Sequence, residues 1–150
     1  MKSSSPNSIA APQTMALVID ASIALGLCFE DLIDATVLQA VETLRTHQAI
    51  VTSLCYHEIA STLLDAERKR RISAPDSRNL LELWKALQPE IDNADTVLAI
   101  DQSLLLAHEH ELHLSEACTL ELALRRKAPL ATRSKELQRA AKRLGILLVI

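Results

Sequence analysis

The stretch ALVID, residues 16–20, is a short continuous run of apolar residues that ends in an acid. Such a run is typical of a strand that is buried on both faces of a parallel sheet. The stretches AIVT (49–52), PLAT (129–132) and ILLVI (146–150) show similar strand-like patterns further along the chain. Because helical spacing separates these runs, the sequence predicts a three-layer α/β/α domain with a mostly parallel central sheet.

The helices are expected where apolar residues recur three and four positions apart. These segments lie near residues 37–44, 59–64, 80–87, 97–105, 117–124 and 137–144. Ser73 and Pro75 mark a helix start, Ser134 is expected to cap the last helix, and Glu121 is placed to pair with Arg125. A brief strand is also possible around residues 90–92.

The composition favours helices and excludes several classes of binding site. Leu and Ala account for 27 and 21 of the 150 residues. The two glycines, Gly26 and Gly145, are too far apart to build a phosphate-binding loop or a dinucleotide fingerprint. Three aromatic residues, Phe29, Tyr56 and Trp84, are too few for a base-stacking platform. Any nucleic acid would have to be held by charge.

Residues 1–14 are polar and are expected to form a flexible N-terminal tail, so the folded domain is predicted to span residues 15–150. The chain shows neither a secretion signal nor an apolar stretch of about 20 residues that could cross a membrane. The three cysteines form no Cys-x-x-Cys pair and fit reduced thiols. These features predict a soluble, cytoplasmic protein with no membrane association.

The residues that end the strands are the first candidates for a functional site, because parallel α/β sheets bind ligands outside the carboxyl ends of their strands. Asp20 ends the first strand, and the hydroxyl of Ser22 follows two positions later. Together they could hold a cation or a phosphate at the rim of the sheet. The alternative for Asp20 is a helix N-cap, a role that Asp performs well.

Two further acids begin helices that belong to the same predicted edge. Glu58 follows the second strand among apolar neighbours, and Glu116 opens the helix SEACTLELAL. Each could instead be an ordinary first-turn Glu that the helix dipole favours. Gathered carboxylates repel one another unless a hard cation such as Mg²⁺ or Mn²⁺ neutralises them. The pattern therefore points to metal-assisted cleavage of a phosphodiester bond.

Three segments carry a resemblance to a known family: VIDASIAL (18–25), YHEIASTLLDAERKRRI (56–72) and HELHLSEACTLELALRRKAPLATRSKEL (110–137). They resemble the PIN-domain ribonucleases, specifically the VapC-type toxins of bacterial toxin–antitoxin pairs, and the resemblance runs in order from about Met15 to Ile150. It implies a PIN-like fold, an Mg²⁺- or Mn²⁺-dependent endoribonuclease that cleaves RNA, a homodimer and a small antitoxin protein as partner.

The resemblance also assigns roles to individual residues. Asp20 and Glu58 match the family's first two acids, and Ser22 matches its small hydroxyl residue. Glu116 stands where the family tends to have Asp, so Asp20, Glu58 and Glu116 form the implied catalytic and metal-binding set. Ser134 stands in the stretch after Thr132 where the family has its fourth Asp. Ser22, Thr132 and Ser134 are therefore a secondary hydroxyl site.

These two departures leave an alternative function open. Glu116 keeps the charge of the family's Asp but moves its oxygens by one methylene group, and octahedral Mg²⁺ tolerates displaced ligands poorly. Ser134 removes a charge and makes an excellent N-cap. The chain could therefore be a catalytically degenerate PIN domain that binds RNA or a protein without cutting.

Basic residues cluster near the end of a chain whose net charge is −3. Half of the 16 Lys and Arg residues lie between positions 125 and 143, with Glu136 as the single acid there. This cluster could neutralise an RNA backbone, or it could be a solvated helix face. The candidates for RNA contact are Arg125, Arg126, Arg133 and Lys135.

Overall fold

The computed structural model describes residues 15–94 and 96–149; the predicted N-terminal tail lies outside the described residues. The elements follow one another in the order β1 (Met15–Ile19), α1 (Ala21–Cys28), the short 3-10 helix η1 (Glu30–Leu32), α2 (Ala35–Thr43), β2 (His47–Val51), α3 (Leu54–Arg68), α4 (Ala74–Ala86), β3 (Glu90–Ile91), α5 (Thr96–His110), α6 (Leu114–Arg126), β4 (Leu130–Ala131) and α7 (Lys135–Arg143). This order confirms the predicted α/β class.

The four strands form one sheet in the order β3-β2-β1-β4, and every pair of neighbouring strands is parallel. In the register of the two central strands, Leu17 lies opposite Ala49 and Val18 opposite Ile50. All the strands therefore end at the same edge of the sheet, and the residues that follow β1, β2 and β4 come close together there.

Successive side chains of β1 point to opposite faces of the sheet and belong to two separate cores. Leu17 and Ile19 are buried on one face against α1, α2 and α3, together with Trp84 of α4. Val18 is buried on the other face with residues of α5, α6 and α7. The sheet is thus covered on both sides, which explains why its central strand is a continuous apolar run.

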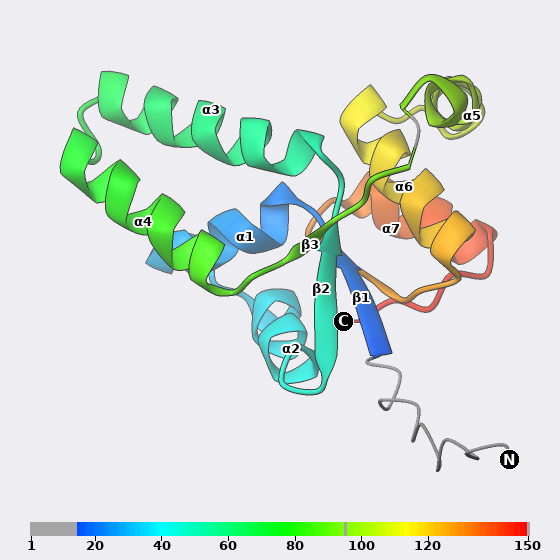
Figure 1. The fold of residues 1–150 in the computed structure, drawn as a ribbon, viewed down its shortest axis with the longest axis horizontal. Helices are drawn as coiled ribbons and strands as arrows, with labels where there is room; N and C mark the ends of the chain where they lie inside the picture. The colour runs from blue at the N-terminus through cyan, green and yellow to red at the C-terminus, as the bar shows by residue number, and fades with distance from the viewer. Residues whose placement is uncertain (1–14, 95, 150) are drawn as a thin grey trace, which may run out of the picture.

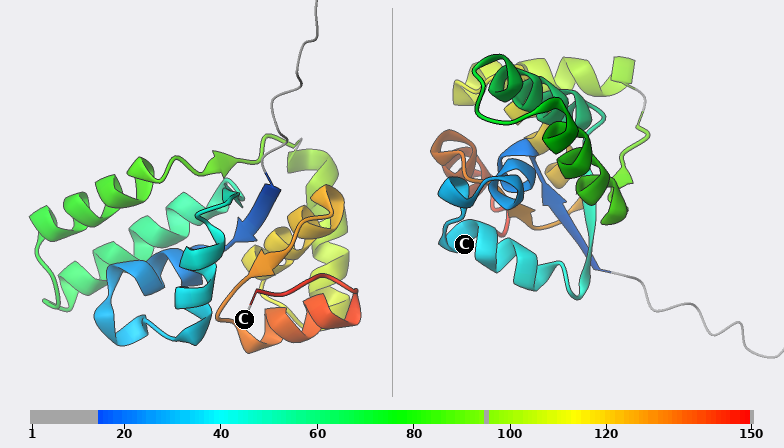
Figure 2. Two further views of the ribbon diagram at one scale, coloured as in Figure 1. Left: turned by 90° about the horizontal axis from the view of Figure 1, so that it is seen from below. Right: turned by 90° about the vertical axis from the view of Figure 1, so that its left-hand side faces the viewer.

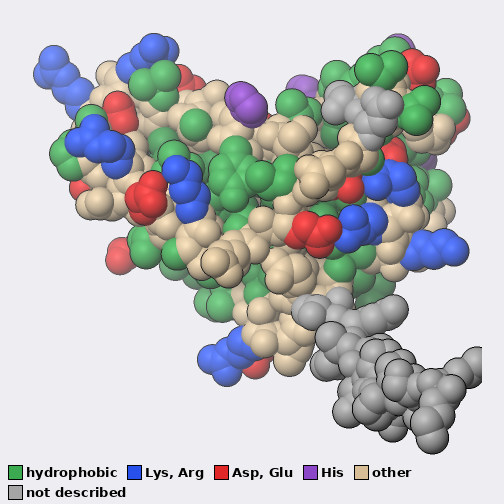
Figure 3. All heavy atoms as spheres, viewed as in Figure 1, with side chains coloured by type: hydrophobic (Ala, Val, Ile, Leu, Met, Phe, Trp, Pro, Cys, Tyr) green, Lys and Arg blue, Asp and Glu red, His purple; other side chains and the backbone are tan. Residues whose placement is uncertain are grey.

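The helices α3 and α4 of one layer and α5 and α6 of the other extend beyond the carboxyl edge of the sheet (Figure 1). Two views at right angles show the same division, with α3 and α4 side by side in one layer and α5 against α6 in the other (Figure 2). In the space-filling view, the surface is hollowed between these two helix pairs (Figure 3).

Several helix starts predicted from the sequence are confirmed. Ser73 and Asp76 form a reciprocal capping box at the start of α4, and Pro75 occupies the first turn. The hydroxyl of Ser134 accepts from the backbone N–H of Leu137 at 3.2 Å and so caps α7. No helix within residues 15–94 and 96–149 is long and apolar enough to span a bilayer.

Two segments differ from the sequence-based expectation. The apolar spacing did not predict the helix α1, and only the N-cap alternative for Asp20 implied it; Asp20 does accept hydrogen bonds from two N–H groups of its first turn. The expected strand ILLVI is reduced to one parallel bridge between Leu148 and Leu130, as far as its described residues show. The reason is that its partner β4 has only two residues, because Thr132 already begins the turn into α7.

Candidate active site at the carboxyl edge of the sheet

Asp20 lies at the centre of the site, because it ends β1 and caps α1 at the same time. Its Oδ1 accepts from the backbone N–H of Ser22 at 3.0 Å, from the Ser22 hydroxyl at 2.5 Å and from the backbone N–H of Ile23 at 3.3 Å. Its Oδ2 accepts from the hydroxyl of Thr132 at 2.5 Å. The helix-cap alternative for Asp20 is therefore confirmed, and its role in a functional site stays a prediction.

Thr132 connects Asp20 to the start of α7. Its side chain is fully buried, and its hydroxyl accepts from the backbone N–H of Ser134 at 3.1 Å while it donates to Asp20. The hydroxyl of Ser134 donates to Glu116 Oε1 at 2.6 Å. The other carboxylate oxygen of Glu116 accepts from the backbone N–H of His113 at 3.2 Å, as in a capping box of α6. A continuous set of hydrogen bonds thus runs from Asp20 to Glu116.

Glu58 lies in the second turn of α3 and faces the same group of acids. Burial raises its pKa, and the negative charges of Asp20 and Glu116 raise it further, while a hydrogen bond with Ser115 lowers it. Burial also raises the pKa of Asp20, against the opposing effect of its hydrogen bonds with Ser22 and Thr132. The structure therefore brings together the three acids that the sequence singled out.

The N-termini of three helices offset part of this repulsion. Asp20 and Ser134 are the N-caps of α1 and α7, and Glu116 lies in the first turn of α6. The positive end of a helix dipole favours carboxylates and phosphate groups. Cys55 lies close enough to these acids to be affected by them. Burial has the largest effect on its thiol, and together with the negative charges of Asp20 and Glu58 it raises the pKa to about 12. Cys55 is therefore not a thiolate nucleophile at neutral pH.

The donor chemistry fits a hard cation, since carboxylate and hydroxyl oxygens are the ligands that Mg²⁺ and Mn²⁺ prefer. The acids are nevertheless too far apart to enclose an ion by themselves. Within residues 15–94 and 96–149, no three His, Cys, Asp or Glu side chains are close enough to hold one ion together. Mg²⁺ is usually bound by one or two carboxylates, and water or substrate phosphate supplies its remaining ligands. The acids fit that mode of binding.

Two of the predicted basic residues flank the site, because they follow β4 in sequence. The backbone N–H of Arg133 donates to the hydroxyl of Ser22 at 2.9 Å, and its side-chain Nε donates to Asp34 Oδ2 at 2.9 Å. Lys135 is the first residue of α7 and is exposed. Arg133 therefore contacts Ser22 through its backbone and Asp34 through its side chain, and Lys135 follows two positions later.

Arg125 and Arg126 lie at the far end of α6 and bind acids of the protein. Arg125 donates to Glu121 Oε1 at 2.7 Å and to Asp92 Oδ2 at 2.5 Å. Arg126 donates to Glu90 Oε1 at 3.1 Å. The predicted pair of Glu121 with Arg125 is thus confirmed, and it belongs to a network that ties α6 to the segment around β3.

Two solved structures share this architecture. PAE2754 from Pyrobaculum aerophilum matches with a TM-score of 0.68 and 19% sequence identity, over 91% of this chain and 85% of that protein. VapBC2 from Rickettsia felis, solved bound to a DNA fragment from its promoter, matches with a TM-score of 0.63 and 12% identity, over 89% of this chain and 97% of the other. Neither a protein-family model nor a curated protein sequence matches the chain. The chain has a PIN-like fold.

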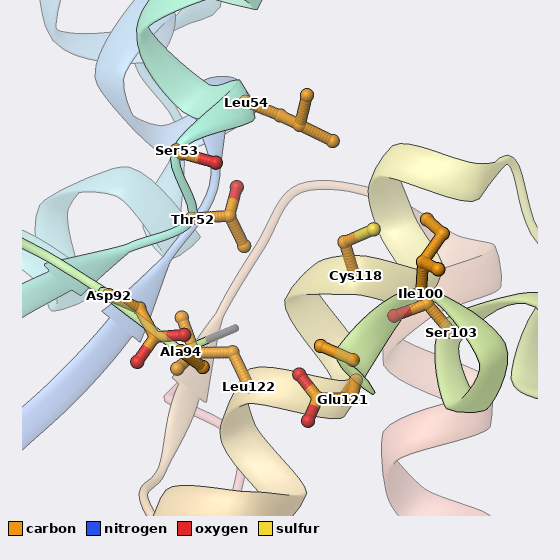
Figure 4. A pocket seen from close by; sticks show the side chains of 11 residues that line it. Thr52, Ser53, Leu54, Asp92, Ala94, Ile100, Ser103, Cys118, Glu121 and Leu122 are labelled. Carbon is orange, nitrogen blue, oxygen red and sulfur yellow. The ribbon is translucent and has the colours of Figure 1, made fainter. Parts of the chain in front are cut away.

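A small cavity of about 60 Å³ lies between the start of α3 and the helices α5 and α6 (Figure 4). Thr52, Cys118, Asp92 and Glu121 are among the residues that line it. Arg125 binds both carboxylates of this cavity, and burial raises the pKa of Cys118. Because its acids are already neutralised, the cavity is a less suitable cation site than the edge around Asp20.

Sequence reasoning missed two residues that contact the site. Ser115 makes a hydrogen bond with Glu58 and lies directly before Glu116, so a hydroxyl next to a predicted ligand could have drawn attention to it. Asp34 binds Arg133 across 99 positions of sequence. Its only local signal is that of a helix cap, which Asp34 provides to Val37 at 2.9 Å.

Proposed function

We propose that the protein is an Mg²⁺- or Mn²⁺-dependent endoribonuclease, the toxin of a toxin–antitoxin pair. The observation that carries the proposal is the position of Asp20, which ends the central strand and shares one electrostatic site with Glu58 and Glu116. The fold is that of a protein called VapBC2, and the sequence resembles VapC-type toxins at the same residues.

In this proposal the carboxylates hold the ion and the hydroxyl groups hold the carboxylates. When it is bound, the ion activates a water molecule for attack on the phosphorus and stabilises the leaving oxygen. Ser22 and Thr132 fix the orientation of Asp20 through bonds of 2.5 Å each. Glu58 completes the negative site from α3, and Glu116 does so from α6, where Ser134 orients it at 2.6 Å.

For contact with RNA we propose Arg133 and Lys135, which follow β4 directly and flank the acids. Phosphate contacts of this kind position a nucleic acid without reading its sequence, and they weaken as the salt concentration rises. For Arg125 and Arg126 we propose that the main role is to stabilise the fold, since both already bind acids at 3.1 Å or less. Either could contact RNA only in competition with those partners.

We further propose that a second copy of the chain and a small antitoxin are its protein partners. The surface offers apolar side chains that such partners could cover. Leu83 of α4 and Leu87, which directly follows this helix, are 65% and 52% exposed beside a cavity of about 250 Å³ between α1 and α4, which Leu27 and Trp84 also line. Exposed apolar patches of this kind often mark protein–protein contact sites.

A catalytically inactive binding module is the second candidate, and one observation favours it. Both carboxylate oxygens of Glu116 already accept hydrogen bonds, one from Ser134 and one from His113. A Glu that is engaged as a helix cap is less available to an ion than a free carboxylate. In this alternative the domain would keep the fold and the basic residues but would bind RNA or protein without cleavage.

The test compares cleavage of single-stranded RNA by the full chain and by Asp20→Asn, each freed of metal with a chelator and then given Mg²⁺ or Mn²⁺. Asn is about as good a helix cap as Asp, so the variant should keep the fold of α1. Metal-dependent cleavage by the parent and its loss in the variant would support the nuclease. Equal cleavage by both would identify a contaminating nuclease, and RNA binding without cleavage would favour the binding module.

A further inference from the structure

Arg133 connects the acidic site to a helix on the other layer of the fold. Its backbone N–H donates to Ser22 Oγ at 2.9 Å, and that hydroxyl in turn donates to Asp20. Its side-chain Nε donates to Asp34 Oδ2, also at 2.9 Å. Arg133 is therefore held at its backbone by Ser22 and at its guanidinium by Asp34, and these two contacts fix where the guanidinium lies.

Asp34 is itself held in place, because its two oxygens have different partners. Oδ1 accepts from the backbone N–H of Val37 at 2.9 Å and caps α2, while Oδ2 accepts from Arg133. The cap and the guanidinium lower the pKa of Asp34, so it is charged at neutral pH. A carboxylate that is fixed by a helix start is a rigid support for an arginine.

We infer that Asp34 is a positioning residue, which holds the Arg133 guanidinium so that its terminal N–H groups engage an RNA phosphate beside Asp20. The inference rests on the proposed function. An arginine carries five N–H donors, and the bond to Asp34 uses only the one on Nε. The terminal nitrogens have no hydrogen-bond partner in the described part of the chain, and the side chain is 28% exposed. Arg133 can therefore bind Asp34 and a phosphate together.

The direction in which RNA affinity changes when Asp34 is neutralised distinguishes the positioning role of Asp34 from a simple effect of its charge. Removing a negative charge near an RNA site should by itself strengthen RNA binding, since the phosphate backbone is repelled less. Removing a support of Arg133 should weaken binding, because the long side chain must then be ordered when RNA binds. Asp34→Asn makes both changes while it keeps a good helix cap.

The experiment measures the affinity of a short fluorescent single-stranded RNA for the full chain without divalent ions, and the KM and kcat of cleavage with Mn²⁺. We expect Asp34→Asn to raise the dissociation constant and the KM by about three- to tenfold, with a smaller change in kcat. Arg133→Lys keeps the charge but loses the planar fork, and we expect a loss of similar size. The double variant should be no weaker than Arg133→Lys alone.

Asp31→Asn is the matched control, because Asp31 is an exposed acid three positions earlier that makes no ion pair with a described residue. Unchanged or tighter binding by Asp34→Asn would overturn the inference, as would an equal loss in Asp31→Asn or an additive loss in the double variant. After any of these three results, the proposed function would still hold if the parent cleaves RNA and Asp20→Asn does not. A parent that neither binds nor cleaves RNA would overturn both.

Discussion

The hydroxyl of Ser134 donates a hydrogen bond to Glu116 Oε1 at 2.6 Å, although 18 positions separate the two residues. The same hydroxyl accepts from the backbone N–H of Leu137, so one side chain caps α7 and orients an acid of α6. These are the two positions at which the chain departs from the VapC-type pattern. Their contact shows that position 134 faces the acidic site, and that a neutral hydroxyl stands beside Glu116 there.

Thr132 is expected to matter for stability because it is fully buried and donates to the half-buried carboxylate of Asp20. Thr132→Val keeps the shape of the side chain but removes this bond and leaves the backbone N–H of Ser134 without its acceptor. We expect the free energy of unfolding to fall by about 2–3 kcal/mol, the range for a lost bond to a charged group. Urea denaturation monitored by circular dichroism measures the change.

Thr119→Val is the control for this substitution. Thr119 is also buried, but its hydroxyl donates at 3.2 Å to a neutral acceptor, the carbonyl of Ser115 in the preceding turn of α6. Its loss should cost about 1 kcal/mol or less. Equal losses of stability in the two variants would show that the hydrogen bond from Thr132 to Asp20 stabilises the fold no more than a bond to a neutral acceptor does.

The sequence was sufficient to predict a mostly parallel sheet that contains β1, β2 and β4, and it singled out Asp20, Glu58 and Glu116, whose role as a metal site stays a prediction. Short continuous apolar runs are typical of strands covered on both faces, and polar residues that directly follow parallel strands meet at one edge of the sheet. The helix α1 was missed because its eight residues, ASIALGLC, are nearly all apolar and show no helical period. Only the cap at Asp20 marked its start.

The contacts between distant segments could not be predicted in the same way. Asp34 looks like any helix cap in the sequence, and nothing near it indicates that its second oxygen binds Arg133. The basic cluster between residues 125 and 143 reads as one surface, yet Arg125 is bound to Asp92 across 33 positions. Composition records how many charges a segment has, and only the fold decides which of them are already paired.

Glu58 should make the stability of the metal-free protein depend on pH. Because burial and the charges of Asp20 and Glu116 raise its pKa above the usual 4.5, the folded state holds this proton more tightly than the unfolded state does. The contribution of protonated Glu58 to the free energy of unfolding is fully present below pH 4.5 and is lost as the pH rises through the raised pKa. Glu58→Gln removes the effect, so we expect the variant to be more stable than the parent at pH 7 and to differ little from it at pH 4.

Thermal unfolding of both proteins across this pH range, in the presence of a chelator, measures the difference. Glu67→Gln on the same helix removes an equal charge nine residues away and serves as control. A gain for Glu58→Gln that does not change with pH would show that the acids do not interact. With Mn²⁺ added the order should reverse, because the parent keeps a ligand that the variant lacks.

Arg125 and Arg126 are neighbours in sequence but should differ in their effect on stability. Arg125 binds Glu121, whose side chain is only 10% exposed, whereas Arg126 binds Glu90, which is 45% exposed. Arg125→Ala leaves a nearly buried acid with no partner and should cost about 2–3 kcal/mol. Arg126→Ala breaks the exposed pair with Glu90 and a longer contact of 3.6 Å with Asp92, which keeps Arg125 as its partner, and should cost less than about 1 kcal/mol. Denaturant midpoints of the two variants provide the comparison, and equal midpoints would contradict it.

The substitution Ser134→Asp restores a charge that the VapC-type pattern has and this chain lacks. The new carboxylate would lie beside Glu116, so we expect it to tighten Mn²⁺ or Mg²⁺ binding about tenfold, or by about 1.4 kcal/mol. The cap of α7 should be kept, while metal-free stability falls by about 1 kcal/mol because another charge joins a repulsive cluster. Arg133 next to it would reduce both effects by pairing with the new charge.

Ser134→Asn is the matched control, since Asn caps a helix about as well as Asp but carries no charge. Calorimetric titration with Mn²⁺ gives the affinity of the parent, the Asp variant and the Asn variant, and thermal unfolding with a chelator gives their metal-free stability. The Asn variant should bind the ion no more tightly than the parent. If the Asp variant matched the Asn variant in both affinity and stability, a carboxylate at position 134 would not join the site of Asp20, Glu58 and Glu116, and the metal-binding set proposed for this chain would end at those three acids.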